Sequence, residues 1–237
     1  MSDIGYYIAY PASKELHRNA RDFIRLMKEE NPKRHDTLLA HTMTLLTNET
    51  IDVYLTDILS TSTLSDNRRK LVETADSFLK NTARVLIKQV SKKVNVKQQL
   101  KTAEHIDSCL LSLEGENQPS IEWVAYPIST SFYQQIISGH HDFLELNSGD
   151  EKSIIIENQK AITHEMVHFL IERLVSSINL GPVLTKVINT ATNKSVQLMQ
   201  STLQKSLTAM TTDEIIKTNQ QVAEMLIMGP VHHSMIP

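Results

Sequence analysis

Apolar residues recur along this chain at intervals of three and four positions, which is the spacing of one face of an α-helix. The first such segment has apolar residues at positions 16, 20, 23, 24 and 27. Pro11 and Ser13 precede it, and serine is a preferred N-cap residue. Asn31 and Pro32 follow it, and a proline at this place ends a helix. The pattern therefore predicts a helix between Ser13 and Asn31.

The same spacing predicts three more helices before residue 115. The second has Asp36 or Thr37 as its candidate N-cap and extends to a polar loop at 60–67. The third covers the apolar positions of 71–90, and the fourth covers those of 100–113 and ends at a glycine. Four amphipathic segments joined by short polar loops are typical of a helical bundle.

The pattern then starts again after a linker-like stretch at 116–120. The sequence YIAYPAS at 7–13 returns as WVAYPIS at 123–129, an offset of 116 residues. An alignment of His41 with His164 raises the offset to 123, and later in the chain it returns to 116. Co-linear self-similarity of this kind predicts a tandem duplication. The alternative is that helical segments of similar composition align by chance at heptad-like offsets.

We therefore expect an all-α fold, an internally duplicated helical bundle of about eight main helices in two pseudo-symmetric four-helix copies. The copies are residues 1–115 and 116–237, packed as one globular unit. Only 121–126 and 153–156 have a strand-like composition, and we interpret the first as the entry segment of the second copy. The residues predicted for the centre of the core are Phe23, Leu46, Leu110, Phe143 and Leu226.

The composition is that of a helical globular protein. Of 237 residues, 41% are apolar and 22% are charged, and only 6 Gly and 7 Pro interrupt the chain. The single cysteine, Cys109, excludes an internal disulfide and a cysteine-rich metal site. No apolar run reaches the roughly 18 residues of a membrane span, and the N-terminus lacks a signal-peptide pattern. A cytoplasmic location is therefore expected.

The charge pattern does not predict a nucleic-acid partner. The formal net charge is −3, and the one basic stripe has no aromatic residue among its members that could stack on bases. We interpret this stripe as a solvated helix face. It consists of Lys88, Lys92, Lys93, Lys97 and Lys101.

The one motif with catalytic character lies in an apolar helical run. His164, Glu165 and His168 have the spacing H-E-x-x-H, which on a helix stacks two imidazoles one turn apart. Both can then bind one zinc ion, and the carboxylate beside them can act as a general base. A catalytic zinc also needs a third protein ligand. Glu172 follows His168 by one turn, and the more distant candidates, none at a typical spacing, are Asp213, Glu214, Glu224, His232 and His233.

The predicted duplication weakens the zinc hypothesis. His41 aligns with His164, but Thr42 and Leu45 stand where the glutamate and the second histidine of the motif would be required. The sequence therefore favours a non-enzymatic binding, scaffold or regulatory role, with no cofactor and an unidentified protein as partner. Two alternatives stay open. One is a zinc-dependent hydrolase that uses the motif, and the other is a bundle that binds a small apolar molecule between its two copies.

Overall fold

The computed structural model describes residues 4–60, 65–115, 118–145 and 151–230, which are mostly helical, with one four-stranded sheet. The first half contains β1 (Ile4–Pro11), α1 (Lys14–Met27), α2 (Asp36–Ile51), the π-helical η1 (Asp52–Asp57), α3 (Ile58–Ser60), α4 (Asp66–Ser91), α5 (Val96–Ser108) and β2 (Leu110–Gly115). The second half contains β3 (Gln118–Ile128), α6 (Thr130–Glu145), α7 (Glu151–Val167), the π-helical η2 (His168–Arg173), α8 (Leu174–Ile178), α9 (Pro182–Thr208), α10 (Thr212–Glu224) and β4 (Leu226–Pro230).

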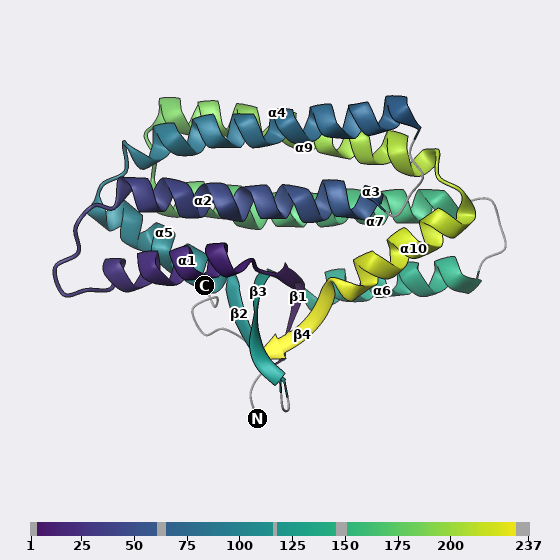
Figure 1. The fold of residues 1–237 in the computed structure, drawn as a ribbon, viewed down its shortest axis with the longest axis horizontal. Coiled ribbons are helices and arrows are strands. Elements are labelled where there is room, and N and C mark those ends of the chain that lie inside the picture. The colour runs from purple at the N-terminus through teal and green to yellow at the C-terminus, as the bar shows by residue number, and fades with distance from the viewer. Residues whose placement is uncertain (1–3, 61–64, 116–117, 146–150, 231–237) are drawn as a thin grey trace.

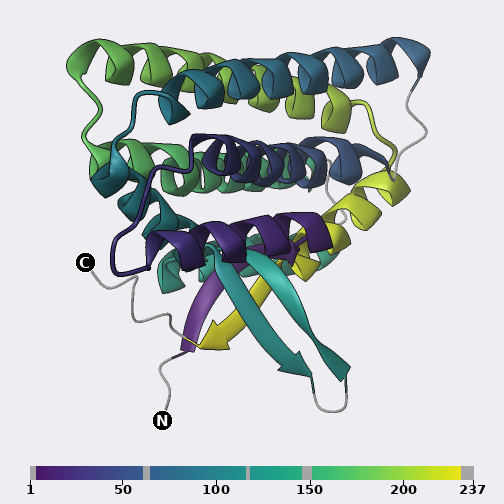
Figure 2. The ribbon, with the colours of Figure 1, turned by 60° about the vertical axis from the view of Figure 1, so that its left-hand side comes forward.

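The helices are stacked in layers on one side of the sheet (Figure 1). Helices α4 and α9 form the layer farthest from the sheet, α2 and α7 form the next, and α1, α5, α6 and α10 lie nearest to it. Figure 2 shows the same layers from another side. Helix α4 packs on α2, α9 packs on α7, and α4 and α9 contact each other. The interior between these four helices is therefore a seam between the two halves of the chain.

The sheet also joins the two halves. Its strand order is β2-β3-β1-β4, and all neighbouring strands are antiparallel. In the central pair, Ala9 of β1 lies opposite Ala125 of β3. Each central strand also pairs with a strand that ends the other half, because β1 pairs with β4 and β3 pairs with β2. The halves thus share one continuous sheet.

The prediction of a mostly helical chain is confirmed, but the all-α class was too narrow. The segments around 7–13 and 123–129 are strands, with alternate residues on the two faces of the sheet. Ile8 and Val124 face the main core, whereas Ala9 and Ala125 belong to a small cluster on the opposite face. Runs this short are ambiguous between strand and helix until a partner strand is known.

The end of the fourth helix and the end of the linker were also predicted wrongly. The fourth predicted helix was extended to residue 115, but α5 ends at Ser108, and Leu110 pairs with Val124 in the sheet. The backbone groups of Leu110–Gly115 therefore bond to β3 rather than to a preceding helical turn. The strand-like stretch 153–156 lies within α7. Within the predicted linker, Gln118 already belongs to β3.

Helix starts and stops follow local chemistry. Ser13 is the N-cap of α1, as predicted, and its Oγ accepts a hydrogen bond from the N–H of Leu16 at 3.0 Å. For α2 the N-cap is His35 rather than Asp36 or Thr37. Between α8 and α9, Asn179 adopts a left-handed conformation with φ of 48°, which ends the helix.

The element order of the first half recurs in the second at an offset of 116 residues. Helices α1 and α6 start 116 residues apart, and so do η1 and η2, α4 and α9, and β2 and β4. Capping boxes recur in the same way, at Asn95 with Gln98 and at Thr211 with Glu214. Because η1 and η2 follow α2 and α7 at this offset, His164 stands at the position of Asn48. The predicted alignment of His164 with His41, at an offset of 123, was therefore wrong.

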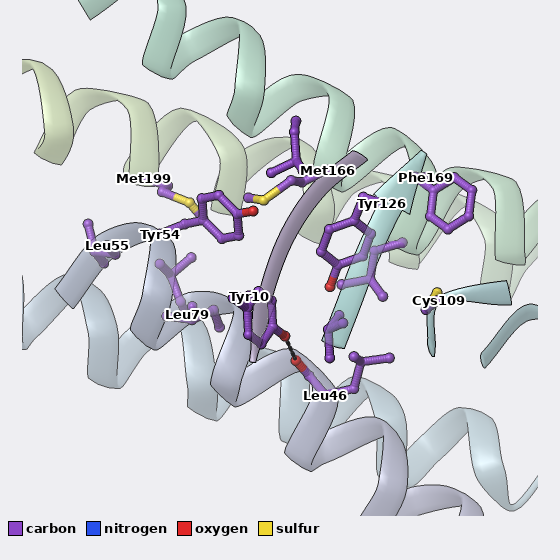
Figure 3. Packing of buried hydrophobic residues seen from close by; sticks show 14 of the residues in the cluster. Tyr10, Leu46, Tyr54, Leu55, Leu79, Cys109, Tyr126, Met166, Phe169 and Met199 are labelled. Carbon is purple, nitrogen blue, oxygen red and sulfur yellow. Dashed lines mark hydrogen bonds between the residues drawn. The ribbon is translucent and has the colours of Figure 1, made fainter. Parts of the chain in front are cut away.

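The predicted core centre is largely correct. Phe23, Leu46 and Leu110 are at most 2% exposed, whereas Leu226 is only half-buried and the side chain of Phe143 lies outside the described residues. The core also contains tyrosines, among them Tyr10 and Tyr126 (Figure 3). Their hydroxyl groups lie 2.8 and 2.7 Å from Oγ1 of Thr50 in α2. Burial raises the pKa of both phenols well above the usual value.

Candidate functional site

The H-E-x-x-H motif lies on the surface where α7 passes into η2. The side chains of His164, Glu165 and His168 are 69%, 39% and 57% exposed. Nδ1 of His168 lies 2.8 Å from a carboxylate oxygen of Glu172, which is one turn further along the chain. The second histidine of the motif therefore already has a local partner.

The geometry of the two imidazoles does not converge on one metal position. The rings of His164 and His168 are stacked, with 6.5 Å between centroids and 1° between planes. A metal ion lies close to the plane of each imidazole that binds it, at about 2.0–2.1 Å from the nitrogen. Two separated parallel planes share no such point. In the arrangement described, at least one ring would have to rotate before both could bind the same ion.

Further ligands are not close by within the described residues. That part of the chain contains no group of three or more histidine, cysteine, aspartate or glutamate residues placed to hold a metal ion. Among the candidate third ligands, Asp213 and Glu214 lie in the first turn of α10, where Glu214 completes a capping box. His232 and His233 lie outside the described residues.

The position of Glu165 has a structural role in the first half of the chain. The residue 116 positions earlier is Glu49, also on a helix of the middle layer. Glu49 accepts hydrogen bonds from the backbone N–H of Ser13, at 3.1 Å, and from its hydroxyl group. These bonds fix α2 to the start of α1. A glutamate at this place can therefore serve the fold without any catalytic function.

A second candidate site lies in the seam between the halves. An apolar cavity of about 110 Å³, here called the end cavity, is lined from α2, α4 and α5 of the first half and from η2, α8 and α9 of the second. A cavity of about 80 Å³, the central cavity, adjoins it. No charged side chain is among the described residues that line either one. Both cavities are lined by Thr47, Ala83, Leu86, Leu170, Ile171 and Thr192.

Four residues of the end cavity are smaller or shorter than the residues 116 places away. Ala83, Ser91, Val94 and Leu170 all line it. The residues at the matching positions of the other half, 116 places away, are larger or longer and are at most 6% exposed. We call these four residues the filled end; they are Tyr54, Leu207, Met210 and Met199, of which Met199 also lines the central cavity. At these four positions, the side chains that line the end cavity are therefore smaller than those of the filled end.

The polar groups near the cavities are mostly hydroxyls. Thr50, whose Oγ1 lies between the hydroxyls of Tyr10 and Tyr126, lines the central cavity together with Thr82 and Ser195. Hydroxyl groups can bond locally to the helix backbone, as Thr50 does to the carbonyl of Leu46 at 2.7 Å. The cavities therefore offer apolar contact and a few weak polar contacts, and no acid–base pair suited to catalysis.

Two titratable groups of the first half, His105 and Cys109, are held neutral. His105 of α5 stacks on Phe169 of η2, with 5.1 Å between ring centroids. Burial, and secondly the positive charge of Arg173, lower the pKa of His105 to about 4. Burial raises the pKa of Cys109 to about 12, so this thiol is a core group rather than a nucleophile.

The sequence pointed to a surface motif, whereas the structure directs attention to the interior. The signal for the cavity was present as smaller residues at positions that are larger 116 residues away, but such a difference in size indicates a cavity only when the surrounding helices are known. No described helix is long and apolar enough to cross a membrane. Comparisons of the chain with protein-family models, with curated proteins and with solved structures found no match.

Proposed function

We propose that this chain is a non-enzymatic binding protein, a tandem duplication whose two copies hold a small apolar molecule between them. The observation that carries this proposal is the apolar end cavity in the seam, with the central cavity beside it. Binding sites for small molecules are typically concave and mostly apolar, with few polar groups. The apolar cavities therefore favour the binding of a small apolar ligand over a protein-scaffold role.

The size of the cavities sets the size of the ligand. An engineered apolar cavity of roughly 150 Å³ in another protein stays dry and binds benzene. The end cavity, at about 110 Å³, is of the same order, and the central cavity adds further space beside it. A single aromatic ring or a short alkyl chain therefore fits this volume.

The recurrence of local structure supports the duplication. The register of the sheet places Ala9 opposite Ala125, and these two residues are themselves 116 positions apart. A twofold rotation about an axis through this pair would superimpose the strand pair Leu110–Val124 on the pair Leu226–Ile8. Both pairs occur in the sheet. Chance similarity of helices does not account for matching strand register and matching capping boxes.

Toluene binding tests the proposed function. We expect toluene at ten times its Kd to raise the melting temperature of the whole chain by roughly 3–6 °C, because it binds only the folded state. Ala83→Met, which introduces the residue found at the matching position of the filled end, should abolish the shift. Circular dichroism of thermal unfolding measures both effects.

Val85→Met is the matched control. Val85 is also on α4 but is 54% exposed and lines neither cavity, so this variant should respond to toluene like the unaltered chain. A folded protein that shows no shift with toluene would contradict the proposal. So would an equal shift in the Ala83→Met variant, because toluene would then bind elsewhere.

A further inference from the structure

A polar pocket adjoins the end cavity. It has a volume of about 440 Å³ and is built from η2, α8, the turn after α8 and the first half of α9. Val175 and Leu180 line both this pocket and the end cavity. One wall of side chains thus has the apolar cavity on one side and the polar pocket on the other. A molecule that passes this wall can place an apolar part and a polar part in two different environments.

The polar pocket is rich in neutral hydrogen-bonding groups. Three asparagines line it, Asn179, Asn189 and Asn193, and each amide offers a carbonyl oxygen and two N–H donors. Ser176 and Thr185 add hydroxyl groups. Neither amide of Asn189 and Asn193 has a hydrogen-bond partner among the described residues, so both remain available to a ligand.

The charge of the pocket disfavours an anion. Glu172 is the only charged residue among the eight that line it, and its carboxylate is 49% exposed. His168 lies 2.8 Å from that carboxylate but is not part of the lining. An anionic group in the pocket would meet this negative charge with no lining cation beside it. A quaternary ammonium group would be attracted by this half-exposed carboxylate, but it has no donor or acceptor for the asparagine amides and would find no aromatic ring among the lining residues.

We propose that the ligand of the seam is an amphiphile with an apolar tail and an uncharged, hydroxyl-rich head group. The tail enters the end cavity past Val175 and Leu180, and the head group binds to the amides of Asn189 and Asn193 in the polar pocket. This inference rests on the proposed function, since the tail occupies the cavity described there. It adds the chemical class of the ligand and gives the surface beside the H-E-x-x-H motif a binding role.

The first half of the chain differs at the same positions. The residues 116 places before Thr185, Asn189 and Asn193 are Arg69, Glu73 and Ser77. Two of these three carry charges, and all three are exposed on α4. At these three positions, the asparagines therefore lie on the side where the end cavity is open. This agreement between two independent features favours one composite site over two unrelated hollows.

Three compounds with the same eight-carbon tail distinguish the possible head groups. We expect octyl glucoside to bind about tenfold more tightly than octanoate, which Glu172 repels, or octyltrimethylammonium, which cannot form hydrogen bonds to the asparagine amides. Isothermal titration calorimetry with the whole chain, below the concentrations at which these compounds form micelles, gives the three Kd values.

Variants locate each part of the ligand. Asn189→Ala with Asn193→Ala should weaken octyl glucoside about tenfold, because two hydrogen bonds to the head group are lost. Glu172→Gln should narrow the difference between octanoate and octyl glucoside, because it removes the repelling charge. Ala83→Met should abolish binding of all three compounds by filling the space for the tail. Gln197→Ala, an exposed amide of α9 outside the pocket, is the matched control for the asparagine variant.

The outcomes separate this inference from the proposed function. Equal or tighter binding of octanoate or octyltrimethylammonium, with Ala83→Met abolishing it, would overturn the head-group assignment and leave the apolar site intact. An asparagine double variant that binds octyl glucoside normally would have the same consequence. Failure of all three compounds to bind, or binding that Ala83→Met does not change, would overturn both.

Discussion

The end cavity and the filled end are two versions of one packing arrangement. In both, a long helix of the outer layer packs on a helix of the middle layer next to a π-helical segment. At the filled end, Tyr54 and Met199 occupy the interior, whereas Leu170 and Ala83 stand at the matching positions beside the cavity. The backbone therefore tolerates either outcome, and side-chain volume decides whether space remains.

A second difference concerns charge. In the first half, Lys80 forms ion pairs with Asp52 and with Asp76. The residues 116 places later are Val196, His168 and Thr192, and of these Val196 and Thr192 line the cavities. A partly exposed ion cluster of this kind contributes modestly to stability, whereas Val196 and Thr192 are uncharged and line the central cavity. At two of these three positions, residues that form ion pairs in the first half are thus replaced by residues that line the cavities in the second half.

Exchange of residues between the two ends gives the largest expected effect. Met199→Ala removes a buried side chain from the filled end and should lower the free energy of unfolding by about 2–5 kcal/mol. The reciprocal Ala83→Met places a side chain into existing space and should change the free energy by less than about 1.5 kcal/mol. Urea unfolding of both variants measures the two values. Equal costs would mean that the two ends are packed alike.

Sequence periodicity predicted the helices because each buries one continuous apolar face. Phe23 and Leu46 were assigned to the core correctly, and Ser13 was assigned correctly as the N-cap of α1. The sheet was missed because Leu110 and its neighbours form a run too short to distinguish a strand from the last turn of a helix. Strand pairing depends on a partner that is remote in the sequence.

The candidate site was less accessible to sequence analysis than the fold. The motif at His164 stands out because its residue types are chemically distinctive, yet it lies on an exposed surface. A cavity, by contrast, has no distinctive residue type, because it depends on how the surrounding side chains pack. Ala83 and Ser91 are unremarkable in a helical sequence until the helices that surround them are known. Their size becomes informative only together with the packing of the helices around the seam.

The buried histidine gives the next largest effect, and it too distinguishes the halves. His105 stands 116 residues before Gln221, which does not titrate. The pKa of His105 falls from 6.5 to about 4 on folding. Its neutral form is therefore favoured in the folded state, while the unfolded state takes up a proton below pH 6.5. This contribution to stability is present above pH 6.5 and is lost as the pH falls towards 4.

The expected loss is about 2–3 kcal/mol between pH 7 and pH 4, at roughly 1.4 kcal/mol per pKa unit. His105→Gln, which introduces the residue of the other half, should remove that part of the pH dependence. The difference between the two urea-unfolding profiles isolates His105 from the surface carboxylates that titrate in the same range. Parallel profiles would show that His105 is protonated as readily in the folded state as in the unfolded state.

A smaller difference in the free energy of unfolding is expected between variants of Glu49 and Glu165, which are 116 residues apart. Glu49→Ala removes the carboxylate that accepts two hydrogen bonds from Ser13, and should cost about 1 kcal/mol, as the loss of a helix cap does. Glu165→Ala should cost less, because its nearest described ionic neighbour is His164, at 3.9 Å. Urea midpoints of the two variants measure this difference. A larger cost at Glu165 would reverse the comparison and indicate a role for that carboxylate beyond the surface.

The smallest expected effect is that of metal removal on stability. We predict that the chain purified without chelator contains no stoichiometric zinc. Two exposed imidazoles with parallel planes and 6.5 Å between ring centroids supply at most two ligands, and catalytic zinc sites use three. His168 has Glu172 as its partner at 2.8 Å, so binding a metal would also break that contact. Addition of a chelator should leave the melting temperature unchanged, and His168→Ala should not alter the metal content. About one zinc per chain by elemental analysis, lost in His168→Ala, would instead make the surface of α7 and η2 the functional site and the hydrolase the leading hypothesis.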